Sequence, residues 1–225
     1  MAMKVNRTEE NIKMRPLDHA RLCGASLLAV ACLTGPAAAQ AAERFTADLS
    51  PVNAEALGLS ASGIATFAIE DGQLAIEVDA DGLAPGIAHI QHTHGFPDGQ
   101  DATCPTAQAD TNSDGFVDLM EAMAAAGTTM VPFHGELLSL TIPSKTYPVA
   151  NEEGATHFQQ TVAVGDLEQA LEQKFGAGEL ALDSRVVLVH GVPADTDLPA
   201  TVQSLPDVPA QVTLPVACGV IEPAE

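Results

Sequence analysis

The chain has 225 residues and a formal net charge of −21, from 30 acidic and 9 basic side chains. Such an acidic surface repels nucleic acid and anionic membranes and attracts cations, so nucleic acid is excluded as a partner and metal ions are expected. Solubility alone is the other explanation of this charge. The length fits a single domain once a leader is removed.

Residues 1–39 have the features of a secretory signal peptide. A stretch with five basic residues (1–21) precedes an apolar run (22–39) that ends in small residues. We expect cleavage near Ala39, one domain over residues 40–225, and a periplasmic or secreted location. The apolar run is short and contains Gly and Pro, so no membrane span is expected after cleavage. Cys32 leaves a lipoprotein anchor open as an alternative to a soluble protein.

Two cysteines, Cys104 and Cys218, lie beyond the predicted leader. An even pair in an exported protein is most simply explained by a disulfide bond. Two buried thiols are the alternative.

Short stretches rich in β-branched and aromatic residues alternate with turn signals, which predicts an all-β sandwich or barrel. The pair Asp71-Gly72 between two alternating stretches predicts a tight hairpin. Two helices are expected, over 118–127 and over 165–176, the second with Asp166 as its N-cap. The stretch 194–215 is expected to be a loop. The strands are expected at 45–50, 63–70, 73–80, 185–192 and 215–221.

Residues 110–121, DTNSDGFVDLME, fit the calcium loop of EF-hand proteins at every ligand position, with Gly115 at the sharp turn. No helix-length segment precedes this loop and no second loop pairs with it, so a structural calcium clip is expected rather than a sensor. A solvated acidic loop is the alternative. The predicted oxygen ligands are Asp110, Asn112, Asp114, the Phe116 carbonyl, Asp118 and Glu121.

Histidines gather in HIQHTHG (89–95), and a further one, His190, ends an apolar stretch. On a strand, His92 and His94 point to the same face. Neighbouring imidazoles suit copper or zinc, which both accept nitrogen ligands. The alternative for each of them is an ordinary hydrogen-bonded histidine without a metal.

These stretches resemble the copper/zinc superoxide dismutase family over roughly residues 45–221. GLAPGIAHIQHTHG (82–95) is similar to the family's G-L-x-x-G-x-H-G-F-H-x-H, RVVLVHG (185–191) to its strand ending in V-V-H, and VACGVI (216–221) to its C-terminal A-C-G-V-I. The resemblance implies a Greek-key β-sandwich or barrel and a Cys104–Cys218 disulfide. It makes His92, His94 and His190 copper ligands and His89 a nearby structural histidine.

In the family, the histidine that bridges copper and zinc follows the first disulfide cysteine within a few residues. Here the next histidine is His134, and the calcium loop fills the interval, so we expect a short helical insertion at about 105–130. His134 is the candidate fourth copper ligand, with His157 as its alternative. For zinc the chain offers only His134, His157 and Asp166, with Ala163 where the family has a zinc-binding histidine, so a complete zinc site is not expected.

The resemblance implies dismutation of superoxide by bound copper. The family's arginine that draws superoxide to copper is replaced by Pro215, so enzyme activity stays open. Arg185 and Lys145 are candidate replacements for its charge. The alternative function is a non-enzymatic secreted module of the same fold that binds metal or is purely structural.

Overall fold

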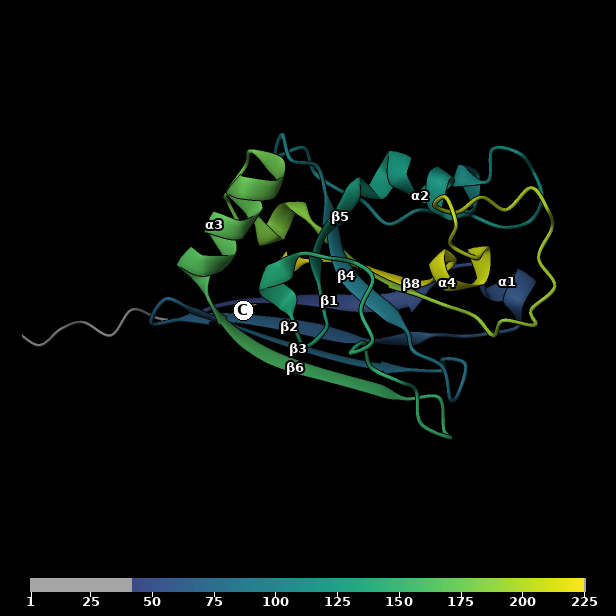
Figure 1. Cartoon of the computed structure of the whole chain (residues 1–225), viewed down its shortest axis with the longest axis horizontal. Coiled ribbons are helices and arrows are strands. Elements are labelled where there is room, and N and C mark those ends of the chain that lie inside the picture. The colour runs from purple at the N-terminus through teal and green to yellow at the C-terminus, as the bar shows by residue number, and fades with distance from the viewer. Residues whose placement is uncertain (1–41, 225) are drawn as a thin grey trace, which may run out of the picture. The chain divides into compact units, whose positions relative to one another are not determined.

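The computed structural model describes residues 42–224, and the predicted signal peptide lies outside them. One antiparallel sheet organises this part of the chain (Figure 1). Its strands follow one another in the order β5-β4-β7-β8-β1-β2-β3-β6, and the short β9 pairs with β1. The strands are β1 (Glu43–Pro51), β2 (Ser62–Glu70), β3 (Gln73–Asp81), β4 (Ile90–Gly95), β5 (Thr128–Pro132), β6 (Thr156–Ala163), β7 (Val186–His190), β8 (Pro215–Val220) and β9 (Glu222–Pro223).

The sheet curls, so that the half formed by β1, β2, β3 and β6 faces the half that contains β4, β5, β7 and β8. The main hydrophobic core lies between the halves, with Phe67 and Ile76 from one half and Met130 and Val189 from the other. Along β3, residues alternate between buried and exposed, as a strand with one face on a core requires. The prediction of an all-β fold is confirmed.

Most strands lie where the sequence predicts them, including the hairpin between β2 and β3. Its turn residues Asp71 and Gly72 both have positive φ, 50° and 74°, which is the backbone of the turn that matches strand twist. Three strands, β5, β6 and the two-residue β9, were not predicted. The five residues of β5 are few for a pattern, and the exposed side of β6 carries Gln and Thr.

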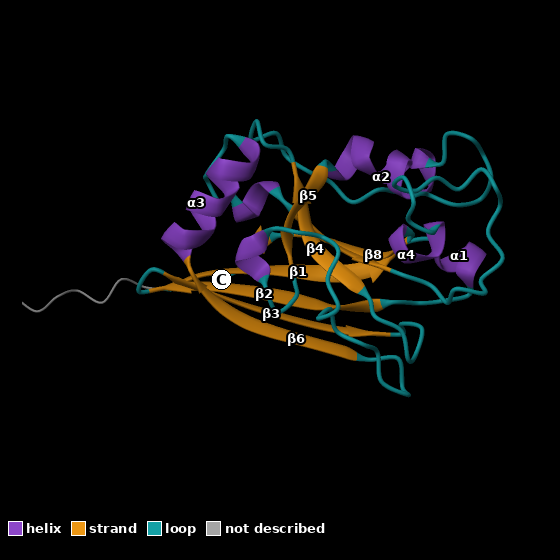
Figure 2. Ribbon diagram, viewed as in Figure 1, coloured by secondary structure: helices purple, strands orange, loops and turns teal. Residues whose placement is uncertain are grey.

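Within residues 42–224 the sheet is accompanied by four α-helices, and Figure 2 shows them on one side of the layer formed by β1, β2, β3 and β6. They are α1 (Ala54–Leu57), α2 (Leu119–Ala126), α3 (Val164–Phe175) and α4 (Ala210–Thr213). The prediction that Asp166 caps the second helix was wrong, because α3 begins two residues earlier and Asp166 lies in its first turn. The predicted loop over 194–215 contains the single turn of α4. None of the helices within residues 42–224 is both long and apolar enough to cross a membrane.

A second, smaller hydrophobic cluster covers the other face of the β7 and β8 strands. Val186 and Leu188 of β7 pack there against Val117 and Ala122 from the predicted insertion at about 105–130. The disulfide Cys104–Cys218, with a Cα–Cα distance of 5.7 Å, joins the start of this insertion to β8. The predicted disulfide is therefore present, and it fastens the insertion to the sheet next to the histidines.

Candidate metal centre

The three predicted copper ligands lie on two neighbouring strands. His92 and His94 share one face of β4, and His190 is the last residue of β7, where it pairs with Ile90. The register shifts after Thr93 against β5 and after Val189 against β8, directly before two of the histidines. Such β-bulges re-aim the side chains that follow them. The bulges therefore belong to the local geometry that brings the rings together.

The three imidazoles form a compact cluster. The ring centroids of His92 and His94 are 4.7 Å apart, those of His92 and His190 are 4.7 Å apart, and those of His94 and His190 are 5.9 Å apart. One ring nitrogen from each lies within 4.8 Å of the other two. All three residues are buried. The structure thus brings together the three residues that the sequence predicts.

Backbone carbonyls orient two of the rings. His94 Nδ1 donates to the Gly127 carbonyl at 3.0 Å, and His190 Nδ1 donates to the Thr213 carbonyl at 2.7 Å. Each bond places the hydrogen on Nδ1 and leaves a lone pair on Nε2, which is the arrangement of a ligating histidine held by a second group. Sequence reasoning missed both anchors, since a carbonyl acceptor has no residue signature.

Two ring nitrogens of the cluster are left without partners. His92 Nδ1 and His190 Nε2 are buried and have no hydrogen-bond partner, and His94 Nε2 has only the Thr129 hydroxyl at 3.2 Å. Buried polar atoms almost always have a hydrogen-bond partner, so two unpaired nitrogens in one cluster are consistent with a site that binds a shared ligand. A cation that accepts nitrogen ligands satisfies all three at once.

Burial keeps the cluster uncharged. Loss of hydration lowers the pKa of His94 to about 3 and that of His190 to about 4, and it lowers the pKa of His92 as well. The proximity of the other rings works in the same direction for His92 and His94, because two imidazolium ions would repel each other. At neutral pH the rings are therefore neutral, which is the form that binds metals.

His89 is a structural residue in this site. Its Nδ1 lies 3.1 Å from the His190 carbonyl and its Nε2 lies 3.0 Å from the Ala84 carbonyl. The fully buried ring thus spans from the end of β7 to the turn before β4. It supports the backbone that carries His190 and has no nitrogen to spare for a metal.

The other two proposed copper ligands do not join the cluster. His134 is buried elsewhere, where its Nε2 donates to the Thr141 carbonyl at 2.7 Å and its Nδ1 accepts from the Glu136 amide at 3.1 Å. His157 lies exposed on β6 and bonds to Asp79. The expectation of a fourth ligand from His134 or His157 is therefore not met, because the insertion does not carry His134 to the cluster and β6 presents His157 outward.

The predicted calcium loop, residues 110–121, adopts a tightly turned conformation. Gly115 has φ 91°, and the side chain of Asp110 accepts from the Gly115 amide at 2.9 Å. Asp118 and Glu121 form a capping box at the start of α2. No three carboxylates of the loop have oxygens within 4.8 Å of one another. The helix before the loop is reduced to one 3₁₀ turn, Ala107–Ala109, so the single-loop interpretation agrees with the structure.

Asn53 holds the calcium loop to the sheet. Its side-chain amide donates to the Val117 carbonyl at 3.0 Å and accepts from the Val117 amide at 2.7 Å, as a partner strand would. The same amide also donates to the Pro215 carbonyl at 3.0 Å. Nothing in the sequence pattern marks this residue, because its partners are backbone groups far away in the chain.

The two candidate replacements for the family's arginine have different surroundings. Arg185 is buried and donates to the carbonyls of Leu180 and Glu179, so it is not free to replace the family's arginine. Lys145 lines a cleft of about 770 Å³ together with Ile90 and Thr213, which flank His190. Of the two candidate replacements, Lys145 is the exposed one, and it shares this cleft with two neighbours of His190.

In comparisons with known proteins, no family model and no curated protein matches this chain. The interpretation of the site therefore rests on its geometry and on the sequence motifs.

Proposed function

We propose that this chain is an exported copper-binding protein related to the copper/zinc superoxide dismutases, with copper held by His92, His94 and His190. The observation that carries the proposal is the pair of buried, unpartnered nitrogens, His92 Nδ1 and His190 Nε2, on two of three histidines that each bring one ring nitrogen within 4.8 Å of the others. Three neutral imidazoles make a donor set that copper accepts.

Strand connectivity supports a Greek-key arrangement. The sheet places β3 beside β6, β4 beside β7 and β8 beside β1, so strands distant in sequence become neighbours. The disulfide joins the two cysteines that the family resemblance pairs. These features support a superoxide dismutase-like fold for a chain whose motifs occur in the family's order.

Copper would supply one-electron chemistry, accepting an electron from one superoxide and giving it to the next. The chain's own part is to position the donors. The carbonyls of Gly127 and Thr213 fix the tautomers of His94 and His190. Burial disfavours the protonated, charged form of the rings. Lys145, exposed on the neighbouring cleft, is the residue that we expect to attract an anionic substrate.

Calcium is proposed as the structural ion of the insertion. Residues 110–121 supply oxygen ligands at every required position, and Gly115 has the backbone that the turn needs. Exported proteins meet abundant calcium, so a weak site suffices. In this proposal calcium holds α2 against β7, next to the histidines.

A second candidate is a copper-binding module without enzymatic activity. The three histidines are only 1–3% exposed, and Pro215 replaces the family's arginine. Both features favour storage or delivery of copper over rapid turnover of an anion.

The test that separates the two candidates is superoxide decay measured with the copper-loaded protein. Dismutase function predicts catalytic decay that is lost in His92→Ala and is slowed in Lys145→Ala, with the slowing largest at low ionic strength. A protein that binds copper through the same histidines yet leaves superoxide decay at the uncatalysed rate would be the non-enzymatic module.

A further inference from the structure

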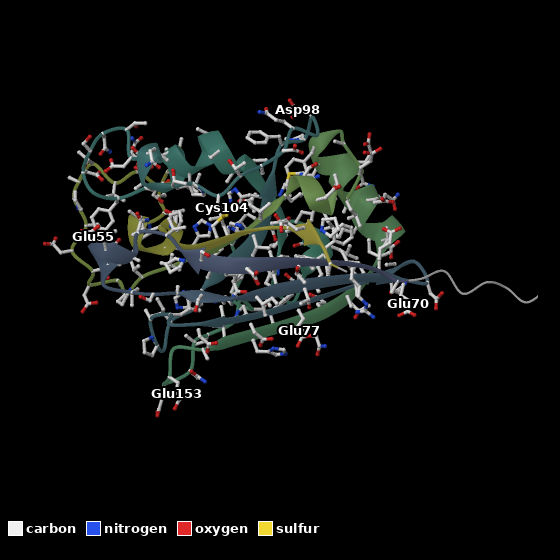
Figure 3. All side chains as sticks on the ribbon, turned by 180° about the vertical axis from the view of Figure 1, so that it is seen from behind. Glu55, Glu70, Glu77, Asp98, Cys104 and Glu153 are labelled. Carbon is white, nitrogen blue, oxygen red and sulfur yellow. A yellow bond between two sulfur atoms is a disulfide. The ribbon has the colours of Figure 1, made fainter. Side chains whose placement is uncertain are left out.

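A second group of metal-ligating side chains lies on the outward face of the sheet. Residues 74, 76, 78 and 80 of β3 point into the core, so Glu77 and Asp79 point out. Figure 3 labels Glu77 on the side of these strands that faces away from the helices. His157 of β6 is paired directly with Asp79, so it occupies the same face.

The three side chains converge. His157 Nδ1 lies 2.8 Å from Asp79 Oδ1, and one ligand atom from each of Glu77, Asp79 and His157 lies within 4.8 Å of the other two. Two donors on one tetrahedral zinc ion, with bonds of ~2.0 Å, are about 3.3 Å apart. Small side-chain rotations at these exposed positions would therefore bring the three ligand atoms to the separation that one zinc ion requires.

The charge of the group also favours a cation. Within residues 42–224, His157–Asp79 is the sole ion pair, so neither Glu77 nor Asp79 has a lysine or arginine partner there. An exposed histidine–carboxylate pair contributes little to stability. The pair alone therefore does not explain why a second carboxylate, that of Glu77, lies at the same place without a cationic partner.

We propose that Glu77, Asp79 and His157 form a second, exchangeable metal site for zinc on the outer face of the sheet. The donor set of one imidazole and two carboxylates is one that zinc accepts, and three protein ligands leave a position open to solvent. This site is independent of the histidine cluster, since it lies on β3 and β6, in the other half of the curled sheet from His92 and His190. It does not rest on the proposed copper function.

The experiment is a zinc titration of the calcium-saturated protein in the His92→Ala background, with a chromophoric zinc indicator as competitor. We expect one zinc ion per chain to remain in this background. Asp79→Asn and His157→Gln should each weaken that binding by about tenfold or more, since each removes one donor. Glu77→Gln should weaken it in the same way.

Asp48→Asn is the matched control, because Asp48 is an exposed carboxylate on β1 whose neighbour across β2 is in register with Asp79. It should bind zinc as the parent does. All four positions are at least partly exposed, so circular dichroism is expected to show folded variants.

Zinc binding that is equal in the parent, Asp79→Asn and His157→Gln would overturn the proposal, as would no zinc binding in the parent. Neither result would bear on copper at His92.

Discussion

His94 and His190 each have one nitrogen bonded to a carbonyl and the other turned towards the cluster, and burial holds both rings neutral. Their pKa values are about 3 and about 4 in the folded protein, against 6.5 for an unperturbed histidine. Below about pH 6.5 these two histidines therefore bind protons in the unfolded chain but stay neutral in the folded protein. The free energy of unfolding falls as the pH decreases.

We predict that the metal-free protein loses stability between about pH 6.5 and about pH 4 more steeply than His94→Gln does. The measurement is the urea midpoint at several pH values in that window. His157→Gln, which changes an exposed histidine, should keep the steep dependence of the parent. Equal slopes for the parent and His94→Gln would show that burial of the ring does not govern the titration.

Asn53 is the second residue with a defined role, since one amide makes three bonds to backbone groups of Val117 and Pro215. Its φ is 59°, so Asn53→Gly removes the amide without straining the backbone. We predict a loss of about 1–3 kcal/mol in unfolding free energy, because buried backbone groups lose their partners. Asp71→Gly, at φ 50° in an exposed turn, is the control and should change stability little. Two equally stable variants would contradict the role of Asn53.

At the scale of elements, alternation predicts the β2–β3 hairpin, because buried and exposed residues alternate along β3. β7 is predicted instead from its run of β-branched residues, and all five of its residues are buried. The same period-2 argument places His92 and His94 on one face, and the structure agrees. The fourth ligand was not predictable, because the path of the chain from α2 to His134 depends on tertiary packing of the insertion. β6 was not predicted because polar side chains such as Gln159 make its sequence unlike that of a typical strand.

The calcium loop and the histidines are linked through two segments. Gly127, whose carbonyl orients His94, caps the C-terminus of α2, and Asp118 caps its N-terminus. On the other side, the Gln203 amide donates to Asp118 Oδ2 at 2.6 Å, and Ser204 bonds to Thr213, whose carbonyl orients His190. An ion in the loop would therefore restrain both histidine anchors.

We predict that removal of calcium with a selective chelator speeds the loss of copper from the copper-loaded protein, by about tenfold, the size of an effect from outer groups that orient ligands. The measurement is the rate of copper transfer to a chromophoric chelator with and without calcium. Asp114→Ala should lose this response, and Asp98→Ala, an exposed carboxylate outside the loop, should keep it. Copper release that does not change with calcium in the parent would rule out the link.

At the scale of the whole molecule, the Cys104–Cys218 disulfide closes a segment of 114 residues. In the chain-entropy account, a loop of this length is worth about 4–5 kcal/mol. We predict that the double variant Cys104→Ser/Cys218→Ser loses stability by roughly this amount, measured by urea unfolding in calcium. A double variant as stable as the parent would show that the second hydrophobic cluster alone holds the insertion on the sheet.

The most direct test of the central claim is electron paramagnetic resonance of the protein with one equivalent of Cu(II), together with copper content after dialysis. The account predicts one bound copper per chain with a nitrogen-rich spectrum, lost in His92→Ala and unchanged in His157→Ala. Copper that binds equally well to His92→Ala, or that fails to bind the parent, would contradict a copper site at His92, His94 and His190.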